Sequence, residues 1–109
     1  MTTILPGEFW IAEIPFTGGM AAKKRPVLVL WLDGRDVVVA TVTSAAPRSL
    51  MNVLLNDWAA SGLRVASTVR LSRLDCLEMS LFLGKIGQIS SSDAQEIKAV
   101  WELRIKPQF

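Results

Sequence analysis

The stretch KKRPVLVLWLDGRDVVVATVTS, residues 23–44, decides the fold. It holds two apolar runs, 25–32 and 36–44, with Asp33-Gly34 between them. Two such runs joined by Asp-Gly predict a β-hairpin with a two-residue turn. Pro26 can begin a strand without losing a ladder hydrogen bond. Neither run alternates between apolar and polar residues, so we expect two antiparallel strands that are covered on both faces.

Shorter patterns on either side of this hairpin predict further strands. They lie, in chain order, at residues 7–16, 53–55, 67–74 and 81–89. In the first of these, Trp10, Ala12 and Ile14 are expected on one face. Between the second and third, Asp57 and Gly62 are placed to cap a single helical turn. The pattern is that of a mainly β protein with short connections.

The end of the chain predicts a helix. Ser90 is a suitable N-cap and Asp93 stands at the capping-box distance from it. An apolar stripe follows at helical spacing, formed by Ala94, Ile97, Val100 and Trp101. We therefore expect residues 1–109 to form one domain, a small and strongly bent antiparallel β-barrel with a C-terminal α-helix.

The composition narrows the classes of function. The 109 residues include no histidine, which argues against a zinc site and removes the commonest general base. The carboxylates are scattered rather than clustered, so we expect neither a metal nor a cofactor. Half of the residues are hydrophobic, which favours apolar surface covered by a partner. The longest apolar stretch, 26–32, is far below the ~18 residues that span a bilayer.

Cysteine usage bears on the compartment. Cys76 is the single cysteine, so no internal disulfide can form and a reducing cytoplasm is expected. We predict that Cys76 is a small buried side chain.

Arg25 and the hydroxyl pair Thr43 and Ser44 frame the hairpin. Because Arg25 precedes proline, its backbone is extended, and its permanently charged guanidinium suits a phosphate. With the turn at Asp33-Gly34, Arg25 is expected opposite Val42 and next to Thr43. The arginine and the hydroxyls would then form a phosphate seat. Alternatively, Arg25 is simply solvated and the hydroxyls bond the local backbone.

Further cations surround the same region. Arg70 and Ser72 are expected on one face of a later strand, where a buried arginine would need an anion. Asp75 or Glu78 could equally supply that anion. Lys23, Lys24 and Arg48 flank the proposed seat and could attract a polyanion, although loop cations are also commonly solvated.

Glu8 is the candidate proton acceptor of the first strand, where ordinary exposure is the alternative.

The order of these segments resembles a known family. The segments are GEFWIAEIPFTGG, KKRPVLVL, VVVATVTS, STVRLSRLDCL and LGKIGQISSSDAQEI. They are similar, over roughly residues 7–103, to the PemK/MazF toxin endoribonucleases of bacterial type II toxin–antitoxin pairs. The resemblance implies an SH3-like barrel and a homodimer. It also implies metal-independent cleavage of single-stranded RNA at short sequences, leaving a 2′,3′-cyclic phosphate and a 5′-hydroxyl.

The resemblance also implies roles and partners. Arg25 falls on the family's catalytic arginine and Thr43 on its catalytic threonine, while Arg70 matches an arginine that some members use near the scissile phosphate. RNA binding is expected to involve Lys23, Lys24, Ser44, Arg48, Arg70 and Ser72. A cognate antitoxin is the implied partner, with DNA binding through the antitoxin complex. Some relatives carry an aspartate where this chain has Ser72, so cleavage rate and sequence preference do not carry over.

Two other readings stay open. One is a gyrase-inhibiting relative, and the other a catalytically silent relative kept as a protein-binding module.

Overall fold

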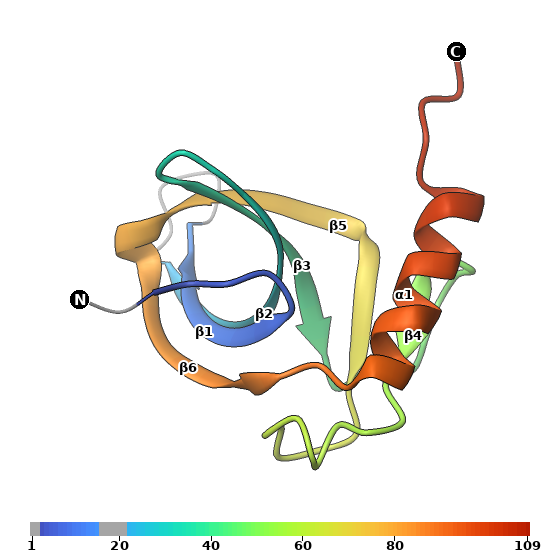
Figure 1. Cartoon of the computed structure of the whole chain (residues 1–109), viewed down its shortest axis with the longest axis horizontal. Coiled ribbons are helices and arrows are strands. Elements are labelled where there is room, and N and C mark those ends of the chain that lie inside the picture. The colour runs from blue at the N-terminus through green and yellow to red at the C-terminus, as the bar shows by residue number, and fades with distance from the viewer. Residues whose placement is uncertain (1–2, 16–21) are drawn as a thin grey trace.

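The computed structural model describes residues 3–15 and 22–109. Its strands form one antiparallel sheet in the order β4-β5-β3-β2-β1-β6. The elements are β1 (Glu8–Ile14), β2 (Lys23–Asp33), β3 (Asp36–Thr43), β4 (Asn52–Leu54), β5 (Thr68–Glu78), a short 3₁₀ helix η1 (Met79–Leu81), β6 (Phe82–Gln88) and α1 (Ser91–Arg104). Figure 1 shows the sheet curling on itself, with α1 beside β4. The predicted mainly β class with a C-terminal helix is confirmed, and the sheet is barrel-like without closing between β4 and β6.

The middle of each central strand is buried on both faces, as the apolar runs predict, whereas Trp31 and Leu32 toward the end of β2 are exposed. Leu28 of β2 belongs to one core cluster, which also contains Ile97 of α1. Val27 and Val29 point to the opposite face and belong to a second cluster, together with Trp10. Each fully buried aliphatic side chain contributes about 1.5–3 kcal/mol. Two clusters on opposite faces explain why these runs do not alternate.

The hairpin turn differs from the predicted one. Asp33 pairs with Asp36, so the turn residues are Gly34 and Arg35, and Gly34 takes the left-handed backbone with φ of 61°. A β-bulge then shifts the register between Val29 and Trp31. A bulge adds one residue to one strand and leaves no plain mark in the sequence.

This register corrects the expected partner of Arg25. Val27 pairs with Thr41, and the same register carried two residues further puts Arg25 level with Thr43 rather than Val42. Paired residues in an antiparallel ladder project on the same face. The predicted pairing with Val42 is therefore wrong, and the correction brings Arg25 and Thr43 closer together.

A sharp corner in β5 shapes the site. Ala40 pairs with Leu74, yet the next residue, Thr41, pairs with Arg70. Residues 71–73 therefore have no partner on β3, and the N–H of Leu71 donates to the carbonyl of Met51 at 3.0 Å. Extra residues bend a strand and increase its twist. Figure 1 shows this bend as a corner in β5.

The start of α1 follows only half of the predicted capping box. The Ser90 hydroxyl accepts from the N–H of Asp93 at 3.1 Å, as expected. The Asp93 carboxylate does not return to the cap. Its two oxygens accept from the backbone N–H groups of Asn56 and Asp57, at 3.0 and 2.9 Å. The buried Asp93 thus fastens the connection between β4 and β5 to the helix.

Cys76 is exposed, so the prediction of a buried cysteine is wrong. Leu77, its neighbour on β5, occupies the core position and is only 4 % exposed. Because successive strand residues alternate between faces, Cys76 is turned outward. In the part of the chain that the structure describes, no helix is long and apolar enough to cross a bilayer.

Candidate functional site

A cleft of about 230 Å³ lies between the first strands and the corner of β5. The residues that line it are Ile14, Arg25, Thr41, Val42, Thr43, Arg70, Arg73 and Asp75. Strands β1, β2, β3 and β5 each contribute to it. Three guanidinium groups against one carboxylate give the cleft an excess of positive charge that suits an anion.

Two polar atoms at the cleft lack a partner. The Oγ1 of Thr41 and the Nε of Arg70 are buried without a hydrogen bond in the described structure. These residues face each other across the β3–β5 ladder. Buried polar atoms without partners are costly, and an arginine nitrogen left so is an unused donor. A bound phosphate oxygen would satisfy it.

Two further hollows adjoin the cleft. A larger one, of about 660 Å³, shares Arg25, Val42 and Thr43 with it and also includes Ser44. A small one, of about 20 Å³, shares Thr43 and Arg70 and also includes Arg48. The predicted residues Arg25, Thr43 and Arg70 therefore come together, with Ser44 and Arg48 at the margins.

Thr43 also makes a local bond. Its Oγ1 accepts from the N–H of Ala45 at 3.2 Å, which is the backbone bond expected of a hydroxyl at a strand end. A hydroxyl has a second lone pair and a hydrogen, so this bond leaves Thr43 able to donate to a ligand.

Ser72, Lys23 and Lys24 do not line the cleft or the two hollows beside it. The Ser72 Oγ accepts from Nδ2 of Asn52 at 3.3 Å and does not line the cleft. Lys23 and Lys24 are exposed at the start of β2, directly before Arg25, and are not among the lining residues of these hollows.

Glu8 lies away from the cleft and is fully engaged. The carboxylate pairs with Nζ of Lys85 at 2.7 Å and accepts from the N–H of Leu5 and from Nε1 of Trp10. Burial alone would raise the pKa of Glu8, but the bonds from Lys85, Leu5 and Trp10 outweigh it and hold the pKa below its ordinary value. The structure thus shows Glu8 as an anchor between β1 and β6.

The comparisons with known proteins place the chain in a family. The model of PemK-like, MazF-like toxins of type II toxin–antitoxin systems matches residues 5–103. The chain belongs to this family. No curated protein sequence matches it.

Solved structures show the same MazF-like fold. An endoribonuclease from a mycobacterial species aligns with a TM-score of 0.75 at 14% identity, covering 100% of this chain and 97% of that one. An endoribonuclease in complex with its cognate antitoxin, also mycobacterial, gives 0.73 at 15%, covering 93% of each chain. The Mycobacterium tuberculosis toxin MazF-mt6 gives a TM-score of 0.70 at 22% identity, covering 87% of this chain and 93% of that one.

Three polar residues of this cleft were not predicted as site residues from the sequence. Thr41, Arg73 and Asp75 line it. Of these, only Asp75 was considered from the sequence, and only as a possible ion-pair partner of Arg70. No ion pair joins Asp75 to the arginines of the cleft in the described structure. Strand alternation favoured Ser72, whereas the corner at residues 71–73 turns Arg73 into the cleft. No sequence signal marks that corner.

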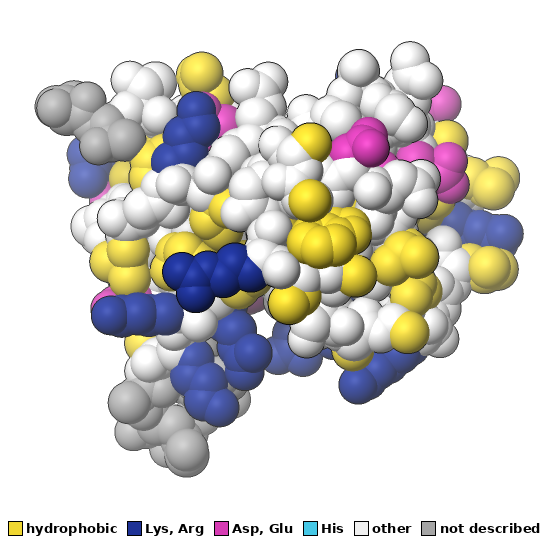
Figure 2. Space-filling view, turned by 90° about the horizontal axis from the view of Figure 1, so that it is seen from below, with side chains coloured by type: hydrophobic (Ala, Val, Ile, Leu, Met, Phe, Trp, Pro, Cys, Tyr) yellow, Lys and Arg dark blue, Asp and Glu magenta, His cyan; other side chains and the backbone are white. Residues whose placement is uncertain are grey.

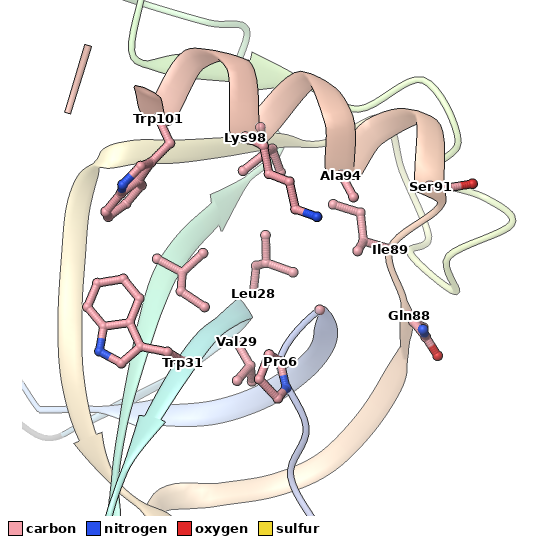
Figure 3. Close-up of a pocket in the computed structure, with 13 residues that line it drawn as sticks. Pro6, Leu28, Val29, Trp31, Gln88, Ile89, Ser91, Ala94, Lys98 and Trp101 are labelled. Carbon is pink, nitrogen blue, oxygen red and sulfur yellow. The ribbon is translucent and has the colours of Figure 1, made fainter. Parts of the chain in front are cut away.

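A separate apolar groove of about 680 Å³ runs between β2 and α1. Figure 3 shows Trp31 and Leu28 of β2 facing Trp101 and Ala94 of the helix across it. The two indoles meet edge to face, with centroids 5.6 Å apart at 87°. Trp31 is 42% exposed. This groove offers burial rather than acid–base chemistry, which suits a protein partner.

Charge is segregated on the surface even though the net charge is only +2. Figure 2 shows most Lys and Arg side chains toward the left and lower side of one face, with others at the right edge, and most Asp and Glu toward the upper right. Such segregation steers a polyanion to one side of the molecule. Among the described residues, no three Cys, Asp or Glu side chains are grouped to hold a metal ion.

Proposed function

We propose that this chain is the toxin of a type II toxin–antitoxin pair and acts as an endoribonuclease on single-stranded RNA. The observation that carries the proposal is the arginine cleft, in which Arg70 Nε is a buried donor without a partner. Membership of the toxin family supports the toxin role. The endoribonucleases among the similar structures support the reaction class.

The reaction proposed is transfer of the phosphate to the RNA's own 2′-oxygen. That oxygen bonds to phosphorus, the bond to the 5′-oxygen breaks, and a 2′,3′-cyclic phosphate and a 5′-hydroxyl result. Arg25 stabilises the charge that gathers on the phosphorane, and Thr43 holds the phosphate in place. Preorganised donors of this kind contribute about 10²–10³ in rate each. Arg70 holds a second phosphate oxygen. No metal is required by these steps.

Asp75 is the proposed acceptor of the 2′-hydroxyl proton. It is the carboxylate that lines the cleft, whereas Glu8 is engaged with Lys85. An arginine keeps its proton and its charge in a protein and is therefore a poor base, so the proposed role of Arg25 is electrostatic only. The leaving 5′-oxygen takes its proton from a water molecule that the Arg73 guanidinium can hold by a hydrogen bond, and the hydroxide left behind takes the proton from Asp75.

The remaining cations bind the RNA chain on either side. Lys23 and Lys24 precede Arg25 on β2, and Arg48 and Ser44 lie at the margins of the cleft. Phosphate contacts of this type fix register and orientation without reading sequence. Ser72 acts indirectly, by bonding Asn52, which in turn accepts from the N–H of Arg48 at 3.0 Å.

The proposed partners are a cognate antitoxin and a second copy of the chain. One similar structure is an endoribonuclease bound to its cognate antitoxin. The exposed apolar groove beside Trp31 and Trp101 is large enough to be covered by another chain. DNA binding would follow only through the antitoxin complex. Both RNA and antitoxin would be met in the cytoplasm.

The test is to incubate purified protein with a long single-stranded RNA in EDTA and to map the ends. Cleavage at a recurrent short motif with cyclic-phosphate ends, absent for Arg25→Ala, is the expected result. A folded protein that leaves the RNA intact with and without added divalent ions would contradict the proposal and favour the protein-binding alternatives. A gyrase supercoiling assay would then separate those two.

A further inference from the structure

The larger hollow beside the cleft has the features of a base-binding subsite. Arg25, Val42 and Thr43 line both spaces, so a ligand group in the hollow would adjoin an anion in the cleft. The hollow measures about 660 Å³, against about 230 Å³ for the cleft. In RNA, the group that adjoins a phosphate and needs the larger space is a nucleotide's sugar and base.

Half of the residues that line the hollow are aliphatic, namely Ile11, Pro26, Val42, Leu63, Val65 and Ile86. Val65 is 53% exposed, which leaves apolar area that a flat ligand would cover. An unpaired base has two apolar faces and is readily splayed out of single-stranded RNA, whereas a paired base is not.

Arg64 supplies the discriminating polar group. It is exposed at the hollow and makes no hydrogen bond or ion pair to the described residues. The Ser67 hydroxyl, by contrast, already donates to the carbonyl of Val65 at 2.8 Å. A guanidinium has donors only, so it selects an edge with two neighbouring acceptors. Guanine offers O6 and N7 side by side, while adenine places a donor beside N7.

The wall that carries Arg64 is held firmly. Gly62 has φ of 95°, and a Cβ there would lie 2.5 Å from the carbonyl oxygen of Ile86. The turn before it closes with the N–H of Leu63 donating to the carbonyl of Trp58 at 3.0 Å. The bonds from Asp93 to the same connection add a second attachment. A wall fixed in advance loses little freedom when a base binds.

We propose that this hollow binds an unpaired guanine adjacent to the cleaved phosphate, with Arg64 as the residue that specifies it. The inference rests on the proposed ribonuclease function for its biological meaning. The binding itself can be tested without any cleavage.

The experiment follows backbone amide NMR shifts of the full chain during titration with guanosine 3′,5′-bisphosphate and with uridine 3′,5′-bisphosphate. These probes carry a phosphate on either side of the nucleoside, so they suit a base on either side of the scissile bond. Inorganic phosphate marks shifts due to the arginine cleft alone. Variants are Arg64→Ala and, as a control that also removes one exposed cation, Arg104→Ala.

Guanosine bisphosphate is expected to shift the amides of residues 62–67 and to bind about tenfold more tightly than the uridine probe. Arg64→Ala should abolish that preference, and Arg104→Ala should retain it. When the cut sites in a long RNA are mapped, the wild type should cut beside a guanine at a fixed position. The Arg64→Ala variant should show no preference for guanine at that position. The inference is overturned if both probes shift only the amides that phosphate shifts, or if Arg64→Ala keeps the guanine preference. Guanine-selective binding by a protein that cuts no RNA would refute the ribonuclease and leave the subsite standing.

Discussion

Removing the Asp93 carboxylate should destabilise the protein more than any exposed acidic substitution. Asp93 is 1% exposed, and its two oxygens accept from the N–H groups of Asn56 and Asp57 at 3.0 and 2.9 Å. Hydrogen bonds to a charged partner contribute about 1.5–3 kcal/mol each. Two such bonds give about 3–6 kcal/mol, and water reaching the freed N–H groups recovers part of it. For Asp93→Ala we therefore expect a loss of about 3–4 kcal/mol.

The assay is equilibrium unfolding in urea, followed by the fluorescence of the four tryptophans at one fixed protein concentration. Against a total stability of about 5–15 kcal/mol, the expected loss lowers the midpoint by about 2 M. Glu96→Ala is the matched control, because Glu96 is exposed on the same helix and should change stability by less than about 0.5 kcal/mol. A loss below about 1 kcal/mol for Asp93→Ala would refute the claim that Asp93 fastens the β4–β5 connection.

Other perturbations have expected outcomes that follow from single contacts. Gly87→Ala should destabilise strongly, because a Cβ there would lie 2.0 Å from the carbonyl oxygen of Ser61, whereas Gly84→Ala meets nothing within 4 Å and should be tolerated. Thermal unfolding of the two variants checks this, and equal midpoints would contradict it. The Glu78 carboxylate accepts from the hydroxyl and N–H of Ser80 and from Arg35, in that order of effect, which lowers its pKa from 4.5 to about 2. Because the folded pKa is the lower one, this contribution to stability is complete above pH 4.5 and disappears as the pH falls toward 2. In Ser80→Ala, NMR titration should show the pKa of Glu78 moving back up, and an unchanged titration would exclude the serine as the main cause.

Much of the architecture follows from local signals. The apolar runs on either side of Asp33-Gly34 predict β2 and β3, and the capping residue Ser90 predicts the start of α1 within one residue. These signals are local because hydrophobic periodicity, turn residues and caps act within a few positions of one another. The pairing of strands that lie far apart in the chain depends on the whole fold and does not follow from these local signals.

The pairing register of β2 with β3, and the face on which residues of β5 lie, were predicted incorrectly. The expected pairing of Arg25 with Val42 failed because the turn residues are Gly34 and Arg35, one residue later than predicted, which moves the register by two positions. The bulge between Val29 and Trp31 takes back only one of them. In β5, strict alternation assigned Ser72 to the cleft, whereas the extra residues at the corner place Arg73 there. A bulge displaces every side chain beyond it and is seldom visible in one sequence.

The candidate site was predicted partly from local chemistry and partly from resemblance. An arginine before a proline and hydroxyls at a strand end suggested a phosphate seat, and the family resemblance gave Arg25, Thr43 and Arg70 their roles. The buried donor of Arg70 and the place of Asp75 depend on which strands meet at the corner of β5. Likewise, nothing in the sequence linked Glu8 to Lys85, because that ion pair joins residues of β1 and β6 that lie far apart in the chain.

The single-turnover cleavage rate of a labelled RNA oligonucleotide, with enzyme in excess and EDTA present, tests the central claim most directly. Arg25→Ala should slow cleavage at least about 100-fold, because it removes a preorganised donor to the phosphorane, while its unfolding midpoint stays unchanged. Arg104→Ala, which removes an exposed cation outside the cleft, should cleave at the wild-type rate. An Arg25→Ala variant that cleaves as fast as the wild type would contradict the assignment of the cleft as the site of RNA cleavage.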